Sequence, residues 1–429
     1  MKRIIIAILV LVMLSAVVFC EGQKEKKITI KVWDQWSIPT DVKAIDLIQD
    51  KFFKEYPNIQ IDRTGMTTEQ IKNLILPAVG SGTGPDIIYP EADVGILAPL
   101  VKAKALLDLT DVWKKQWDNK LFLMSKEFTL LGNRAWGIGN ELEFSPIYYS
   151  KSLFKQLGVT PPTLISDLEK ILDTAKNANY IPITWGGRTW WMVSNYATYV
   201  LWAYMGKAET DKATLIGGTW KVPAAYEGIR TAFVKWVDNN YYAKDAMSLS
   251  FEETMMLLSQ KKTAIFPGAN AFVPQMMEVP DQDFASFLWP VPKKGQRTNT
   301  VTFCGSMYVV NASTKYPKEA IAYLDFILGT EYAARTWYEV ADRVPPYKKP
   351  IPGLKINPLV GETLDVLLKG DADLTPAHNT VAPPEAVSWM TDGIGKVFLK
   401  QITPEEFIDQ LDAFWQKGRE EGLTRDSMK

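Results

Sequence analysis

The sequence predicts an α/β protein organised in two domains. Between residues 28 and 89, short segments that alternate apolar and polar residues are separated by segments of helical periodicity. This order of strand and helix favours a parallel sheet with helices on its faces. The roughly 400 residues after the apolar N-terminus exceed what one hydrophobic core usually serves, so we expect two domains.

The first region contains three expected strands and two expected helices. The strands are at 28–33, 58–62 and 86–89. The first helix is capped by Thr40 or Asp41, and its apolar face carries Val42, Ile45, Ile48 and Phe52. Thr67 and Gln70 have the spacing of a capping box, which predicts the start of the second helix. The stretch 80–85, with three glycines and a proline, ends that helix.

The rest of the chain alternates in the same way. We expect strands at 181–185, 263–266 and 303–311, and helices at 151–158, 190–205, 224–239 and 251–259 and after Pro317. Two further capping boxes, Ser166 with Glu169 and Thr403 with Glu406, predict two more helix starts. The proline-rich stretch 342–358 is expected to be a loop or a crossing segment.

The N-terminus has the features of an export signal. Lys2 and Arg3 precede an uncharged run at 4–19, which charged residues follow closely. A spanning helix needs roughly 20 apolar residues, and the apolar core of a signal peptide is shorter. We therefore expect residues 1–22 to be a signal peptide. Cys20 is either the lipid-accepting cysteine of a lipoprotein or part of an ordinary cleavage site, since Phe19 is larger than lipoprotein sites usually accept.

Cysteine and histidine usage excludes several kinds of chemistry. Beyond the signal, Cys304 is the only cysteine, so no internal disulfide is possible. His378 is the only histidine, which excludes a two-histidine metal site. No G-x-S-x-G motif accompanies any serine, and the glycines at 80–84 lack the order of a phosphate-binding loop. We therefore expect no cofactor and no metal.

The overall charge also limits the partners. The chain carries 48 basic and 49 acidic residues, for a formal net charge of -1. A protein that binds nucleic acid through its phosphates usually has a basic excess. We therefore expect no nucleic-acid partner.

Several stretches together resemble the family 1 extracellular solute-binding proteins of ABC importers, the maltose-binding-protein-like group. The matching stretches are IKVW at 30–33, FKEYPNI at 53–59, GPDII at 84–88, LLDLT at 106–110, YYSKSLF at 148–154, LGVTPP at 157–162, KKTAIF at 261–266, WPVP at 289–292, and GS at 305–306 followed by KEAIAYL at 318–324. Each stretch alone is weak, but their order and spacing extend over roughly 300 residues behind an export signal.

The resemblance implies a two-lobed periplasmic-binding-protein fold, type II-like, with the ligand in a cleft between the lobes. Lobe one would comprise 28–138 and 300–343, and lobe two 139–299 and 344–429. The implied function is that of an importer's receptor, which captures a sugar and delivers it to membrane permease subunits. Such a protein is expected to be a monomer, periplasmic or lipid-anchored at the outer face of the cytoplasmic membrane.

The first candidate ligand-binding residues follow the ends of the expected strands. In open α/β folds, ligands contact residues just beyond the carboxyl ends of strands. Gln35 and Trp36 follow the first strand, and Glu91 follows the third. Trp36 either stacks on a sugar or packs in the core, and Glu91 either accepts sugar hydroxyls or is a solvated surface carboxylate.

A second group of candidate ligand-binding residues consists of tryptophans. Sugars present apolar C–H faces and polar edges, so their sites combine aromatic rings with carboxylates and amides. The chain has 15 Trp, 17 Tyr and 18 Phe, and three tryptophans gather at 185–191 with two glycines and Arg188. We expect Trp185, Trp190 or Trp191 to stack on the ligand, the alternative being a corner of the lobe-two core.

The resemblance itself nominates Glu141, Asn270 and Arg343. Glu141 lies near the first crossing segment, Asn270 lies in the loop after the strand at 263–266, and Arg343 follows a lobe-one helix. For Asn270 and Arg343, structural hydrogen bonding is the alternative role. Glu141 and Glu143 also suggest a glycosidase pair, but their spacing along one strand does not establish the 5–5.5 Å separation that a retaining pair needs. Two alternative functions remain. The protein either binds a non-sugar solute, such as a polyamine or a phosphate ester, or is a secreted carbohydrate-active enzyme.

Overall fold

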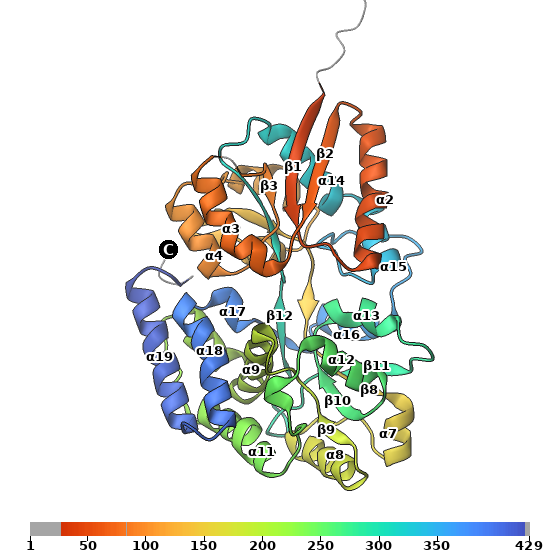
Figure 1. Cartoon of the computed structure of the whole chain (residues 1–429), viewed down its shortest axis with the longest axis vertical. Coiled ribbons are helices and arrows are strands. Elements are labelled where there is room, and N and C mark those ends of the chain that lie inside the picture. Colours follow the sequence, from red (N-terminus) through yellow and green to blue (C-terminus); the bar gives the residue numbers. More distant parts are fainter. Residues whose placement is uncertain (1–26, 83, 425–429) are drawn as a thin grey trace, which may run out of the picture.

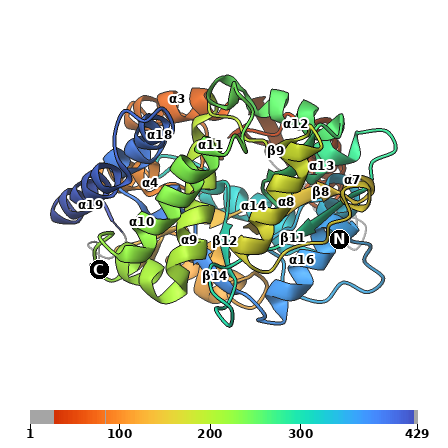
Figure 2. The same cartoon turned by 90° about the horizontal axis from the view of Figure 1, so that it is seen from below.

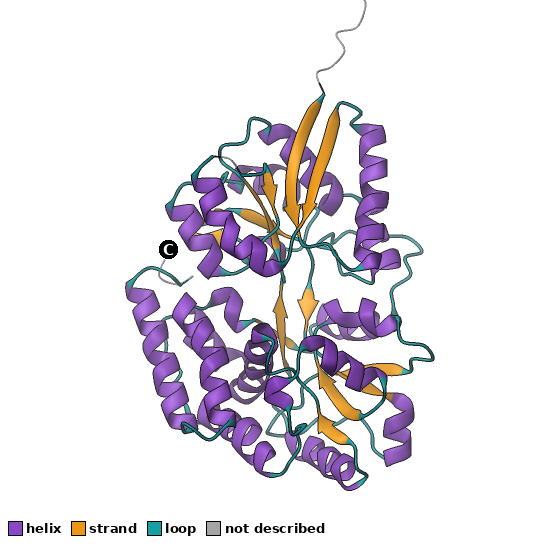
Figure 3. Ribbon diagram, in the orientation of Figure 1, coloured by secondary structure: helices purple, strands orange, loops and turns teal. Residues whose placement is uncertain are grey.

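The computed structural model describes residues 27–82 and 84–424, which form two lobes, upper and lower in Figure 1. The expected signal peptide and Cys20 lie outside the described residues. Across the described part of the chain, no helix is both long enough and apolar enough to cross a membrane. In both lobes, strands lie centrally and helices cover them, as Figure 3 shows.

Lobe one is built on a five-stranded sheet with the order β2-β1-β3-β13-β6. β1 pairs parallel with β2 and β3, whereas β13 runs antiparallel to β3 and β6. The strands are β1 (Ile28–Asp34), β2 (Ile59–Gly65), β3 (Ile87–Ile88), β6 (Gly137–Gly139) and β13 (Met307–Val310). The main helices are α2 (Pro39–Glu55), α3 (Thr68–Gly80), α4 (Val94–Lys102), α14 (Pro317–Gly329) and α15 (Glu331–Ala341).

Local sequence explains the lobe-one elements. Ile30 and Val32 in β1 are buried, and α2 buries Ile45, Ile48 and Phe52 at helical spacing. The predicted capping box at the start of α3 is present. Between β3 and β6 lie short elements: α5 (Thr110–Val112), η1 (Trp113–Trp117), α6 (Met124–Glu127), β4 (Leu130–Leu131) and β5 (Arg134–Ala135).

Lobe two contains a four-stranded sheet with the order β11-β8-β10-β9. Its strands are β8 (Ile147–Ser150), β9 (Ile181–Ile183), β10 (Thr263–Pro267) and β11 (Phe284–Phe287). Figure 2 shows α7 on the opposite side of this lobe from α18 and α19. The helices are α7 (Lys151–Leu157), α8 (Ile165–Asn177), α9 (Trp190–Leu215), α10 (Pro223–Arg230), η2 (Thr231–Lys235), α11 (Trp236–Asp238), η3 (Ala246–Ser248), α12 (Phe251–Ser259), η4 (Asn270–Phe272), α13 (Val273–Met277), α16 (Pro358–Leu368), α17 (His378–Val381), α18 (Pro384–Phe398) and α19 (Pro404–Glu420).

The chain passes between the two sheets in three places. A three-stranded sheet, β14-β12-β7, lies at this junction and contains β7 (Glu143–Phe144), β12 (Asn299–Phe303) and β14 (Asp373–Pro376). The crossings are 140–142, 304–306 and the segment after α15. Hydrogen bonds join them, because Asn140 N–H donates to the carbonyl of Ser306 (3.3 Å) and Leu142 N–H to that of Val344 (2.8 Å). The three crossings therefore form one connected hinge region.

The structure differs from the expected elements in several places. The strand expected at 303–311 is two strands, because the chain leaves β12 at Cys304 and enters the other sheet at Met307. The capping box expected at Ser166 is wrong, because α8 begins at Ile165 and its N-cap position, Leu164, two residues before Ser166, carries no side-chain cap. α9 extends beyond 205, with non-helical backbone at Gly206. The lobe boundaries stay a prediction, but β12 pairs with β14 and β7 rather than with the lobe-one sheet.

Candidate functional site

A cavity of about 440 Å³ lies between the two lobes at the hinge. Side chains from both lobes and from all three crossings line it. The lining residues are Gln35, Trp36, Ser37, Ile38, Asp41, Thr68, Tyr89, Glu91, Glu141, Glu143, Trp191, Asn195, Phe251, Glu252, Ala271, Phe272, Gln275, Phe303, Gly305, Ser306, Arg343 and Asn379.

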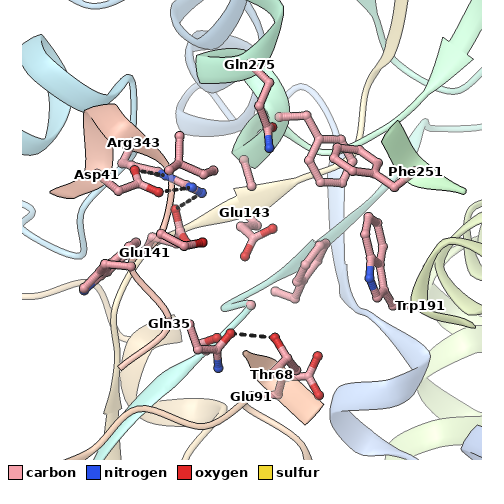
Figure 4. A pocket seen from close by; sticks show the side chains of 18 of the residues that line it. Gln35, Asp41, Thr68, Glu91, Glu141, Glu143, Trp191, Phe251, Gln275 and Arg343 are labelled. Carbon is pink, nitrogen blue, oxygen red and sulfur yellow. Dashed lines mark hydrogen bonds and ion pairs between the residues drawn. The ribbon is translucent and has the colours of Figure 1, made fainter. Parts of the chain in front are cut away.

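The ends of β1 and β3 build the lobe-one wall. Gln35 is fixed on both sides, since its Nε2 donates to the carbonyl of Tyr89 and its Oε1 accepts from Thr68 Oγ1, both at 2.9 Å (Figure 4). Trp36 stacks on Tyr89 with ring centroids 5.0 Å apart, and its Nε1 donates to the Tyr308 hydroxyl at 2.8 Å. Only 8% of Trp36 is exposed, so it both packs the core and contributes an edge to the cavity.

Aromatic rings build part of the lobe-two wall. Trp191 lies in the first turn of α9, with its ring centroid 5.2 Å from that of Phe251 and 5.5 Å from that of Phe272. Figure 4 shows the Trp191 ring across the cavity from the Arg343 group. An aromatic platform therefore faces a polar wall, the arrangement that a sugar face and edge need.

Arg343 holds two carboxylates at the hinge. Its Nη2 and Nε donate to the two oxygens of Asp41 at 2.7 and 3.0 Å, and its Nη1 donates to Glu141 at 3.3 Å. Burial lowers the pKa of Arg343, but Glu141 and Asp41 outweigh it, so the net pKa is raised. Because Asp41 lies on a lobe-one helix and Glu141 and Arg343 on crossings, the cluster ties lobe one to the hinge.

Two further carboxyl groups lie in the cavity wall without such a partner. Burial raises the pKa of Glu91 to about 8, and the charge of Asp93 adds to the rise. Burial, together with the charge of Glu141, also raises the pKa of Glu143, whose carboxyl accepts a hydrogen bond from the Gly305 backbone. Glu91 is therefore largely uncharged at neutral pH when nothing else approaches it, and burial favours the uncharged form of Glu143 as well.

The cavity brings together six of the nine candidates from the sequence: Gln35, Trp36, Glu91, Glu141, Trp191 and Arg343. The other three are not among its lining residues. Trp185 is 1% exposed and packs in the lobe-two core on Tyr196. Trp190 lies under the ammonium group of Lys72, 5.1 Å from its ring centroid. Asn270 is fully buried and bonds to the backbone of Phe144 and Leu142, which is the structural role left open for it.

Sequence reasoning missed most of the remaining polar lining. Several of the missed residues share one feature, a place at or next to the start of a helix: Asp41 in α2, Thr68 in α3, Phe251 and Glu252 in α12, and Asn379 in α17. The capping boxes at Thr67 and Ser250 mark two of these starts in the sequence. The helix starts in the sequence therefore indicate further ligand-binding candidates, which the strand ends alone do not.

His378 and Cys304 take no part in the cavity lining. His378 is fully buried, and its Nε2 accepts a hydrogen bond from Trp415 Nε1 at 3.1 Å. Cys304 is a fully buried thiol beside the crossing, in contact with the backbone at Gly139. Both residues are part of the packing.

The fold agrees with comparisons to known proteins. An ABC transporter extracellular-binding protein of Pyrococcus horikoshii, itself uncharacterised, is 22% identical over 379 residues, which cover 86% of this chain and 83% of that protein. The multiple sugar-binding protein of Streptococcus mutans is 22% identical over 324 residues, or 74% of each chain. A solved structure from work on xylan utilisation by Caldanaerobius polysaccharolyticus superposes with a TM-score of 0.81 at 23% identity, covering 90% of this chain and 99% of that one.

A family model extends over most of the chain. The model described as bacterial extracellular solute-binding protein matches residues 36–334, which include the lobe-two sheet, all strands of the lobe-one sheet except β1, and two of the three crossings. This family consists of binding proteins, not of enzymes. The chain therefore belongs to the bacterial extracellular solute-binding protein family.

Proposed function

We propose that this protein captures a sugar or oligosaccharide in the cavity between its lobes and delivers it to the membrane permease of an ABC importer. The observation that carries the proposal is a single cavity that combines the Trp191 platform with the polar side chains of Gln35, Glu91 and Gln275. Aromatic faces bind sugar C–H patches, and amides and carboxylates bind hydroxyls. The similarity to a multiple sugar-binding protein supports it.

The hinge supports a role in delivery. The cavity wall is divided between two lobes that the three crossings connect, so ligand contacts with both lobes favour closure. The closed form is then the state that a permease would recognise. The similarity to an ABC transporter extracellular-binding protein supports this partner. We further propose that the protein acts as a monomer at the cell exterior, periplasmic or anchored through Cys20.

Two alternative functions receive less support. A phosphate ester would need cations, and Arg343, the one cationic side chain among the described lining residues, is already bound to Asp41 and Glu141. A glycosidase pair would need Glu141 free to act, but it is held by Arg343 and by Asn140 Nδ2 at 3.1 Å.

A thermal-shift screen tests the proposal. Ligand binding to the folded state raises the melting temperature in proportion to the logarithm of ligand concentration over Kd. We expect a shift with at least one mono- or oligosaccharide, and we expect Trp191→Ala to abolish it while Trp190→Ala retains it. No shift with any saccharide, or release of reducing sugar from a glycan, would contradict the proposed function.

A further inference from the structure

The charged groups of the cavity are unbalanced. Among the described lining residues, five carboxyl groups face a single guanidinium and no lysine; the five are Asp41, Glu91, Glu141, Glu143 and Glu252. Arg343 makes three hydrogen bonds to Asp41 and Glu141, so its donors already serve those two groups. Glu252 is exposed and therefore hydrated. Glu91 and Glu143 remain as cavity acids without a bound cation.

The nearest lysine does not change this balance. Lys72 lowers the pKa of Glu91 by its charge, but no ion pair between the two occurs within the described residues, and its ammonium lies over the Trp190 ring. Burying a carboxylate without a paired charge is unfavourable. A cation that entered the cavity would remove this cost for both Glu91 and Glu143.

Several hydrogen-bond acceptors of the cavity-lining residues have no donor within the described part of the chain. Four oxygen atoms of the lining residues are almost completely buried and have no partner among the residues that the structure describes: Glu91 Oε2, Asn195 Oδ1, Gln275 Oε1 and Asn379 Oδ1. Asn195 is only 8% exposed. Buried acceptors of this kind are normally satisfied, and only a donor can satisfy them. A donor-rich ligand therefore fits the cavity better than one that brings mainly acceptors.

Helix starts near the cavity do not supply the missing positive charge. The first turns of α2, α3 and α12 carry partial positive charge, but each contains its own acid: Asp41, Glu69, and Glu252 with Glu253. Side-chain caps from Thr67 and Ser250 also occupy N–H groups at the starts of α3 and α12. Glu91 follows β3 and Glu143 lies in β7, so neither is at one of these helix starts.

We propose that the ligand is a saccharide bearing a protonated primary amine, and that Glu91 and Glu143 receive its ammonium group. This inference rests on the proposed function and narrows it. An ammonium group offers three donors and no acceptor, and it carries the charge that the two acids lack. The sugar ring that bears it stacks on Trp191. An N-acetyl group or a hydroxyl in the same place provides at most one donor and no charge.

The proposal predicts that binding releases protons. Burial and the neighbouring acids Asp93 and Glu69 raise the pKa of Glu91, and Lys72 opposes them. Burial and the neighbouring acids Glu141 and Glu91 raise the pKa of Glu143, and Arg343 opposes them. An ammonium group favours the carboxylate form and expels the proton. Affinity for an aminated saccharide therefore rises with pH below the pKa of Glu91, near 8, over the range in which the ligand amine stays protonated. A neutral saccharide that accepts hydrogen bonds from protonated acids shows the opposite trend.

Calorimetric titration with matched ligand sets tests the proposal. The sets are glucosamine, N-acetylglucosamine and glucose; the corresponding galactose series; β-1,4-linked glucosamine oligomers with their N-acetylated forms; and spermidine as an amine without a sugar. We expect the aminated saccharide of at least one set to bind roughly tenfold or more tightly than its neutral counterparts, with proton release. Tighter binding of neutral saccharides overturns this inference and leaves the proposed function standing. Binding of spermidine alone, or of nothing, overturns both.

Two variants test whether Glu91 and Glu143 bind the amine of the ligand. Glu143→Gln and Glu91→Gln keep the size of the side chain and remove its charge, so each is expected to lower affinity for the aminated saccharide roughly tenfold while changing affinity for its neutral counterpart less. Asp371→Asn, a change at an exposed carboxylate outside the cavity lining, is the matched control and leaves both affinities unchanged. Equal loss for aminated and neutral ligands in both variants overturns the assignment.

Discussion

Gly305 lies directly against the carboxyl group of Glu143. A Cβ atom at position 305 would overlap Glu143 Oε1, and the Gly305 backbone donates a hydrogen bond to the same carboxyl. Gly305 lies in the crossing 304–306, Glu143 begins β7 directly after the crossing 140–142, and both line the cavity. The absence of a side chain at 305 is therefore what allows Glu143 to reach the cavity wall.

We expect Gly305→Ala to displace the Glu143 carboxyl and weaken ligand binding by roughly tenfold or more, measured by calorimetric titration. Overpacking a buried site also costs about 1–3 kcal/mol of unfolding free energy. Gly361→Ala is the matched control, because the nearest atom to its new Cβ would be 3.6 Å away and the position lies inside α16. That variant is expected to gain about 0.5–1 kcal/mol and to bind normally. Unchanged affinity in Gly305→Ala would show that Glu143 does not contact the ligand.

The Arg343 cluster leads to a second prediction. Arg343→Met leaves the buried carboxylates of Asp41 and Glu141 without their cation, and we expect a loss of about 3–5 kcal/mol in urea unfolding. Arg297→Met is the control, because Arg297 pairs with Asp373 at the surface with 55% and 27% of the two side chains exposed. Its expected loss is below about 1 kcal/mol. Similar losses in the two variants would contradict a special role for the buried cluster.

The fold was largely predictable because its elements carry local signals. The alternating segment at 28–33 and the capping boxes at Thr67 and Thr403 each specify an element through interactions within a few residues, and all three are confirmed. The helices α15 and α18 were not expected, although Thr330 caps the first and Pro384 begins the second. Neither start has the Glu or Gln partner of a capping box, so the local signal is weaker than at Thr67 and Thr403.

The candidate site was predictable only in part, because its contacts join residues far apart in the chain. Arg343 and Asp41 are separated by 302 positions, and the sequence near either residue does not indicate that the two form an ion pair. Trp185 and Trp191 illustrate the same limit. They lie in one local cluster, yet the end of β9 turns Trp185 into the core, whereas the first turn of α9 directs Trp191 into the cavity. Which way each ring points depends on how β9 and α9 pack in the lobe.

These two tryptophans give a third prediction. Trp185→Ala removes a ring that stacks with Tyr196 in the lobe-two core, and we expect it to lower the unfolding free energy by about 3–5 kcal/mol. Trp191→Ala removes a partly exposed ring and is expected to cost less stability but to eliminate the ligand-induced thermal shift. Urea unfolding and thermal shift on both variants separate the two roles. A stable Trp185→Ala variant that fails to bind would place Trp185 in the site after all.

The buried histidine gives a fourth prediction, on the pH dependence of stability. Burial lowers the pKa of His378 to about 3, whereas an unfolded histidine has a pKa near 6.5. Between these values the unfolded chain binds the proton and the folded protein does not, so the stability that neutral His378 contributes is complete above about pH 6.5 and is lost as the pH falls toward 3. We expect this residue to account for about 3 kcal/mol of lost stability between pH 6.5 and pH 4. His378→Gln retains an acceptor for Trp415 Nε1 and cannot titrate, so the difference between the unfolding free energies of the natural protein and this variant should shrink or reverse across that range. A difference that stays constant from pH 7 to pH 4 would mean that His378 accepts its proton without unfolding the protein around it.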